Sequence, residues 1–299
     1  MKKIITILGA TGNVGSKTVK HLLGKGHTLR LIARGAEKLS AFKNESGVEI
    51  HSGTATDSDF LAGVMKGSDV VFLMMPADFT AVNIGAYQDK LGLAIIDAIK
   101  KSGVKKVLNL SSVGGHTEEK TGIVAGLARQ EKRLNDLTDV DVLHLRPSYF
   151  MENLLGNIPI IKNMHVNGSP IAADRAFPII ATADVARAAA EQLDSATWSG
   201  KSVQPLLGPK DYTMNEVTSV LSNAIGQPNL SYVQFPFDQA KQGMMQMGLN
   251  ESFADAYIGL SDGINHGVFN LEKRDNTSTT PTTIEEFTTN VFQPVYQSN

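Results

Sequence analysis

The sequence predicts an α/β protein built on a doubly wound parallel sheet, for three reasons. Short apolar runs, typical of strands buried on both faces, alternate with segments of helical periodicity over roughly the first half of the chain. The first run, residues 4–8, leads at once into the glycine-rich turn GATGNVG at residues 9–15. A segment with apolar residues at helical spacing follows that turn. Strands and helices in this order are typical of right-handed crossovers between parallel strands.

The glycine-rich turn indicates a dinucleotide site. The start of the following helix presents unpaired N–H groups and the positive end of the helix dipole, which suit a pyrophosphate. Gly9 can form the tight turn, Gly12 can let phosphates approach the backbone, and Gly15 can let the helix pack against the strand. Three glycines at this spacing are a weak signal in a chain with 27 glycines, so a turn that binds nothing is the alternative. The strand before the turn and the helix after it favour the dinucleotide.

The end of the second predicted strand, residues 28–33, bears on which dinucleotide is bound. An acidic residue at this place would favour NAD. The chain instead has Arg34, and its first acidic residue afterwards is Glu37. Because a guanidinium can pair with a ribose 2′-phosphate, we expect NADP(H) as cofactor, with Lys38 as a weaker second contact. A solvated arginine at a strand end is the alternative.

The remaining strands of the expected dinucleotide-binding domain, residues 1–150, follow in order. We expect strands near residues 48–51, 69–75, 107–110 and 141–145, and helices near 59–66, 84–101 and 121–135. Ser111 follows the fifth strand, at the edge where open α/β sheets bind ligands. The candidate cofactor-binding residues belong to the turn and to these strand ends: Gly9, Thr11, Gly12, Asn13, Val14, Gly15, Arg34, Lys38, Met75, Pro76 and Ser111.

Residues 151–299 lack this regular alternation and predict a smaller, mainly helical substrate subdomain. A strand near 202–207 is expected to complete the main sheet. The expected helices are 183–193 with a Thr182 cap, 213–226 with a Thr213–Glu216 capping box, 237–248, 251–266, and a last one capped by Thr282 with Glu285. Such a lid would cover the carboxyl edge of the sheet and shape a substrate pocket.

Composition and charge exclude several classes of function. The 28 basic and 30 acidic residues nearly cancel, so we expect no direct nucleic-acid binding and no membrane-surface role. The chain has no cysteine, and its seven histidines form no metal-binding motif, so we expect no metal site. No apolar stretch approaches the ~20 residues that cross a bilayer, and no cleavage pattern follows the first apolar run. We therefore expect a soluble, cytoplasmic protein.

Two further motifs have competing interpretations. Residues 259–263, GLSDG, match the G-x-S-x-G pattern of a hydrolase nucleophile. That serine needs a preceding strand, whereas apolar residues at helical spacing run straight through this segment, so we do not expect a hydrolase. Met244, Met245 and Met247 could line an adaptable apolar pocket, although packing in a core is the commoner role of methionine.

Several segments together resemble the NmrA-like family of the atypical short-chain dehydrogenase/reductase superfamily. They are GATGNVG at 9–15, Ser111-Ser112, RPSYFMENLL at 146–155, ATADVARAAAEQL at 181–193, LLGPKDYTMNEV at 206–217 and TPTTIEEF at 280–287. The resemblance runs nearly end to end and implies a Rossmann fold that binds NADP(H). Some members reduce quinones or related conjugated compounds, whereas others bind the dinucleotide without known turnover and act as redox sensors or regulators.

The resemblance therefore implies one of two functions. The first, which we favour, is NADPH-dependent reduction of a quinone or similar apolar, aromatic small molecule. The alternative is a non-catalytic NADP(H)-binding regulator that acts through a protein partner. A homodimer is compatible with either function.

The proton donor is less well defined than the cofactor turn. Hydride transfer to a carbonyl or quinone develops negative charge on oxygen, which a placed acid stabilises. Many short-chain reductases supply a tyrosine and a lysine four residues apart, but none of the six tyrosines here has that partner. Relatives often carry a lysine or histidine shortly before a glutamate, where this chain has Leu127 and Ala128 before Glu131.

Three candidate catalytic residues remain: Ser111, His116 and Tyr149. His116 follows two glycines in a predicted loop, and an exposed loop histidine is the alternative interpretation. Tyr149 could equally form a pocket wall. A quinone is already electrophilic, so its reduction can proceed with little acid catalysis.

Overall fold

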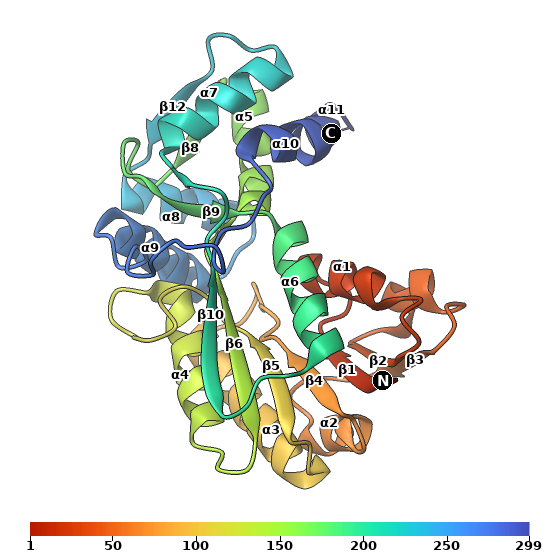
Figure 1. Ribbon diagram of the computed structural model, residues 1–299. Coiled ribbons are helices and arrows are strands. Elements are labelled where there is room, and N and C mark those ends of the chain that lie inside the picture. Colours follow the sequence, from red (N-terminus) through yellow and green to blue (C-terminus); the bar gives the residue numbers. More distant parts are fainter. Residues whose placement is uncertain (299) are drawn as a thin grey trace.

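The main sheet confirms the predicted fold class. The computed structural model describes residues 1–298 and contains seven parallel strands in the order β10-β6-β5-β4-β1-β2-β3 (Figure 1). The strands are β1 (Ile4–Leu8), β2 (Thr28–Ala33), β3 (Val48–Ser52), β4 (Val70–Leu73), β5 (Lys106–Leu110), β6 (Asp141–Pro147) and β10 (Lys201–Leu206). The strand order reverses between β1 and β4, the place where doubly wound sheets bind their ligands.

Helices cover both faces of this sheet (Figure 1). One apolar layer joins the sheet to α1 (Asn13–Leu22) and α6 (Thr182–Ser195). The other joins it to α2 (Ser58–Met65), α3 (Ile84–Ser102) and α4 (Ala125–Asn135). In the central strands β1 and β4, successive residues therefore enter opposite layers and nearly all are buried, which explains their apolar runs in the sequence.

The smaller part of the molecule lies beyond the carboxyl edge of the sheet (Figure 1). The chain enters it after β6, returns to the main sheet for α6 and β10, and then leaves again. Its elements are β7 (Tyr149–Phe150), η3 (Met151–Asn157), α5 (Ile158–Met164), β8 (Val166–Ser169), β9 (Phe177–Ile180), β11 (Asp211–Tyr212), α7 (Met214–Ile225), β12 (Ser231–Gln234), α8 (Phe237–Gln246), α9 (Glu251–Asn265), α10 (Ile284–Phe287), η4 (Thr288–Phe292) and α11 (Gln293–Ser298).

Two short sheets, β11-β9-β7 and β12-β8, add to the predicted helices of this part. They were not expected, because strands of two to four residues carry almost no periodic signal. Two 3₁₀ helices, η1 (Ala36–Phe42) and the single turn η2 (Gly122–Val124), complete the element list. In the described chain, no helix is both long and apolar enough to cross a membrane.

Two predicted helix caps are wrong in detail. Thr182 is the first helical residue of α6 rather than its cap, and its side chain binds Lys17 and Glu152 instead. The last capping box uses Thr283 with Glu286, one residue later than predicted. The reason for the shift is that the N–H of Thr282 donates to Asp184 (2.9 Å), which fixes Thr282 just before the helix. The Thr213–Glu216 capping box is confirmed.

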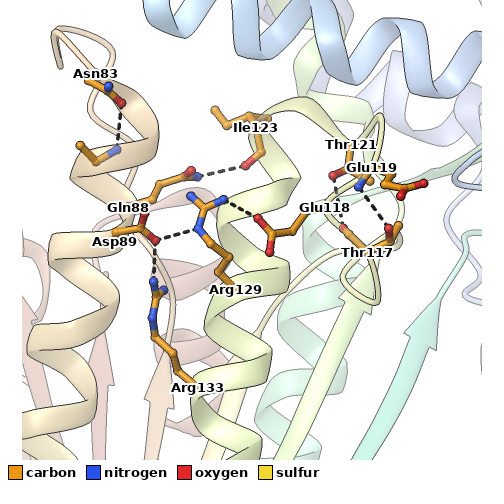
Figure 2. A network of polar contacts seen from close by, with 11 residues as sticks. Asn83, Gln88, Asp89, Thr117, Glu118, Glu119, Thr121, Ile123, Arg129 and Arg133 are labelled. Atoms are coloured by element: carbon orange, nitrogen blue, oxygen red, sulfur yellow. Dashed lines mark hydrogen bonds and ion pairs between the residues drawn. The ribbon is translucent and has the colours of Figure 1, made fainter.

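A polar network fixes the loop between β5 and α4, which begins at Ser111 (Figure 2). Asp89 on α3 accepts from Arg129 Nε (2.7 Å) and Arg133 Nη2 (2.5 Å) on α4. Arg129 also donates to Glu118 in the loop (3.0 Å). Arg129 therefore links α3, α4 and the loop, and these contacts hold the loop in place near the end of the sheet.

Candidate functional site

The turn between β1 and α1 has the backbone geometry of a phosphate cradle. Gly9 has φ +75°, a left-handed conformation that favours glycine, and its carbonyl accepts from the N–H of Gly12 (3.0 Å). A Cβ on Gly15 would lie 2.2 Å from the Gly9 oxygen, so only glycine allows α1 to start this close to the turn. A Cβ on Gly12 would meet nothing closer than 3.4 Å, because this side of the turn is open.

The N-terminus of α1, where Gly12 is the N-cap residue, has neither a capping side chain nor an acidic residue in its first turn. Its N–H groups and helix dipole therefore face the open side of the turn. Thr11 and Asn13 are exposed beside it, whereas the Val14 side chain is buried in the core, so Val14 could contact a ligand only through its backbone.

The predicted 2′-phosphate contacts lie at the exposed end of β2. Arg34 directly follows this strand, and Lys38 is exposed in η1. Across the same edge, the loop after β4 carries Met75, Pro76 and Asp78. Hydrogen bonds from the Thr80 hydroxyl and N–H lower the pKa of Asp78, and the positive charge of Arg34 lowers it further.

Ser111 belongs to a buried charge network. Its hydroxyl donates to Glu131 Oε1 (2.5 Å), and Arg146 binds the same carboxylate through Nε (2.9 Å) and Nη2 (2.7 Å). Arg146 Nη1 also donates to Glu272 (3.1 Å), which comes from the far end of the chain. Because its proton is directed to Glu131, Ser111 is held in place rather than offered to a ligand.

A small cavity of about 160 Å³ opens beside Ser111 at the ends of β5 and β6. Tyr149 lines it, and the Tyr149 hydroxyl lies 3.0 Å from the hydroxyl of Tyr257 on α9. Burial and the neighbouring Tyr257 raise the pKa of Tyr149 well above its ordinary value, so this phenol stays protonated. Leu127, which with Ala128 stands where the resemblance leads us to expect a basic residue, lines the same cavity.

The three catalytic candidates thus separate in space. Ser111 and Tyr149 line one cavity. His116 is exposed on the loop after β5 and lines neither the small cavity nor the larger one described next. Tyr257, which the sequence interpretation missed, joins Tyr149 from α9, 108 residues away.

A larger cavity of about 660 Å³ lies beneath α8 and α9. Met244 and Met247 line it, as the methionine pattern suggested, but Met245 does not. Tyr257 forms part of its wall, and Asn153 lines both cavities. The Tyr149–Tyr257 hydroxyl pair therefore lies where the two cavities meet.

Residues of the quoted motifs tie the two parts of the molecule together. Glu152, from RPSYFMENLL, accepts from the N–H of Thr182 at the start of α6 (3.0 Å) and from Lys17 on α1 (3.1 Å). Asp184, from ATADVARAAAEQL, accepts from Thr282 near the end of the chain. Glu152 and Asp184 therefore link elements of the two parts, whereas Tyr149 and Asn153 of the first motif line the cavities.

A match to a family model identifies the family of this protein. The NmrA-like family matches residues 1–288. The chain belongs to the NmrA-like family. The resemblance drawn from the sequence motifs is therefore confirmed.

Individual relatives are more distant. The NAD(P)H azoreductase of Xenophilus azovorans is 28% identical over 253 residues, which cover 85% of this chain and 84% of that protein. An NADPH-dependent quinone oxidoreductase of Escherichia coli, solved with NADPH, is 23% identical with a TM-score of 0.82, covering 97% of this chain and 100% of that one. NmrA, a negative transcriptional regulator solved with NADP, is 16% identical with a TM-score of 0.67, covering 100% and 98%. The two structural likenesses show a shared fold.

Proposed function

We propose that this protein is an NADPH-dependent reductase of quinones or similar conjugated small molecules. The observation that carries the proposal is that the glycine turn after β1 and the small cavity at the ends of β5 and β6 lie at the same carboxyl edge of one sheet, and that the large cavity shares Asn153 with the small one. The named activities of the azoreductase and of the quinone oxidoreductase support NAD(P)H-dependent reduction as the class of reaction. That the acceptor is a quinone is a more specific proposal than this class of reaction.

The cradle residues fit NADPH. The backbone of residues 9–15 and the start of α1 would hold the pyrophosphate, with Thr11 and Asn13 beside it. Arg34 would pair with the 2′-phosphate, assisted by Lys38, while Met75, Pro76 and Ser111 would border the cofactor at the strand ends. When bound, NADPH would supply the hydride.

The small cavity would hold the acceptor and stabilise the charge that develops on it. Its apolar walls, which include Leu127, would exclude water from the acceptor. Tyr149 stays protonated and can donate a hydrogen bond to the acceptor oxygen as negative charge develops there. Ser111 would position the loop through Glu131 rather than act as an acid. His116 is removed from the proposed mechanism because it is exposed outside the cavity.

A single-turnover experiment tests this reaction. Protein loaded with NADPH is mixed without oxygen with 1,4-naphthoquinone, and loss of reduced nicotinamide absorbance is followed. The proposal predicts a rate well above that in buffer, and a primary isotope effect when the transferred hydrogen of NADPH is deuterium. A rate equal to that in buffer, from protein shown to bind NADPH, would contradict it.

A non-catalytic NADP(H) regulator is the second candidate. The fold shared with the regulator NmrA favours it, as do Leu127 and Ala128, which stand where the resemblance implies that reductases often carry a lysine or histidine. This candidate predicts tight binding, a measurable preference between NADP⁺ and NADPH, and no consumption of cofactor. A protein partner or a second copy of the chain would then bind with an affinity that depends on which form of the cofactor is bound.

A further inference from the structure

We propose that the 660 Å³ cavity beneath α8 and α9 is the specificity site for the acceptor, and that it selects neutral aromatic molecules over charged ones. This inference rests on the proposed reductase and deepens it by naming the substrate class.

The wall of this cavity combines side-chain amides with apolar groups. Asn153, Asn163, Gln239 and Gln242 supply amides, and Met164 and Met244 supply thioethers. Of the described residues that line the cavity, none is charged, although charged residues make up 19% of the chain. The nearest basic residue along α8, Lys241, is engaged in ion pairs with Glu251 (2.9 Å) and Asp255 (2.7 Å) on α9.

This composition discriminates by charge. A sulfonate or ammonium group placed in the cavity would lose water and gain no opposite charge, which is costly. A neutral aromatic ring would instead gain thioether contacts of about 0.3–1.5 kcal/mol each. The amides can donate to carbonyl groups and accept from N–H groups on the ligand. The wall therefore fits an uncharged aromatic molecule that carries carbonyl or amide groups.

The tyrosine pair lies between the large cavity and the small cavity, where we propose that the acceptor is reduced. The small cavity, about 160 Å³, is below the range of roughly 300–1,000 Å³ that is typical for ligand sites, and the large cavity is within it. Tyr149 lines the first and Tyr257 the second, with their hydroxyls 3.0 Å apart. An acceptor whose reducible ring occupies the small cavity would pass this pair and place its remaining part in the large one.

Two adjacent methionines on α8 provide a matched test. Met244 lines the cavity, whereas Met245 is 42% exposed and does not. Affinities for anthraquinone-2-carboxamide and anthraquinone-2-sulfonate are measured by calorimetry on protein saturated with NADP⁺, so that no turnover interferes. We expect the wild type to bind the neutral compound about 10-fold more tightly or better, in line with ~1.4 kcal/mol or more of uncompensated charge burial.

The variants then reverse or preserve this preference. Met244→Lys is expected to weaken binding of the carboxamide and strengthen binding of the sulfonate. Met245→Lys is expected to keep the wild-type ratio of the affinities for the carboxamide and the sulfonate. Equal wild-type affinities for the two compounds would overturn the inference, as would a Met245→Lys ratio that changes as much as that of Met244→Lys. Thermal unfolding and NADP⁺ affinity of both variants show whether each is folded.

Wild-type turnover separates this inference from the proposed function. NADPH oxidation is measured with 1,4-benzoquinone, a single ring that needs only the small cavity. Turnover without a charge preference in binding overturns the specificity site and supports the reductase. A charge preference without turnover of any quinone supports a neutral aromatic site and overturns the reductase.

Discussion

The proposed cofactor cradle and the proposed acceptor site in the large cavity differ in how they are built. The cradle at residues 9–15 is made of backbone, and a Cβ at Gly15 would collide with the Gly9 carbonyl. Much of the large cavity is lined by flexible side chains, such as Met244 and Gln242 on α8, outside the main sheet. A ligand that is always the same can be met by a rigid backbone turn, whereas an acceptor that varies is met by side chains that repack.

The largest effect is expected at the rigid region. In Gly15→Ala the new Cβ lies 2.2 Å from a carbonyl oxygen, so α1 must move away from the turn. Overpacking of this kind costs about 3 kcal/mol. If this cost falls on the bound state, NADPH should bind about 100-fold more weakly, as measured by fluorescence titration. Gly63→Ala is the control, because its Cβ would meet nothing within 4 Å and a helical alanine stabilises α2 (Ser58–Met65) by up to about 1 kcal/mol. Unchanged NADPH affinity in Gly15→Ala would show that the cradle is not the binding site.

Acid should weaken the sheet region before it alters the large cavity. Burial lowers the pKa of His144 on β6 to about 4, and the imidazole accepts from Asn109 (3.1 Å) and bonds to Asn135 (3.0 Å) as a neutral ring. Its ordinary pKa is 6.5, so the unfolded chain binds a proton first as the pH falls. The contribution to stability is complete above about pH 6.5 and is lost between pH 6.5 and 4, at most ~3 kcal/mol.

Urea unfolding at pH 7 and pH 5 measures this loss. His144→Gln removes the titrating group and should show a smaller difference between the two pH values than the wild type. Acceptor affinity at the large cavity, whose described walls carry no charged group, should stay constant over this range while the protein remains folded. Identical pH dependence in wild type and variant would show that His144 is not the group responsible.

Arg34 is the side chain that we propose selects NADPH over NADH. Arg34→Ala removes a charge-assisted contact worth about 1.5–3 kcal/mol, so NADPH should bind about 10- to 100-fold more weakly. NADH lacks the 2′-phosphate and serves as the internal control, with little expected change. Equal losses for the two cofactors would remove the reason for assigning NADPH.

The smallest effect is expected in the adaptable region. Met244→Ala removes one thioether from a wall of flexible side chains that can partly repack, so KM for a multi-ring quinone should rise only about threefold, or ~0.7 kcal/mol. Met245→Ala, outside the cavity, is the matched control. A 100-fold rise for Met244→Ala would mean that the cavity is as rigid as the cradle and that the comparison between the two regions is wrong.

The two regions also differ in how well the sequence predicts them. Gly9 and Gly15 can be interpreted locally, because the backbone conformation they allow depends on a few neighbouring residues. The strands of the main sheet were predicted to within a few residues for a similar reason, since the central ones, such as β1 and β4, are short runs rich in apolar residues.

Long-range pairs could not be predicted in this way. Tyr149 meets Tyr257 across 108 residues, and Arg146 meets Glu272 across 126. Neither pair has a spacing that periodicity could reveal, because the folding of several intervening elements brings the partners together. Thr182 shows the same limit, since its sequence position suggests a cap but its neighbours Lys17 and Glu152 give it a different bond.

The central claim is that this protein consumes NADPH to reduce a conjugated acceptor. The most direct measurement is steady-state NADPH oxidation by the purified protein across a panel of neutral quinones, with NADH run in parallel. The account predicts turnover well above the uncatalysed rate, with NADPH preferred. Failure to consume NADPH with every quinone, in a preparation that binds NADPH, would contradict the reductase and favour the regulator.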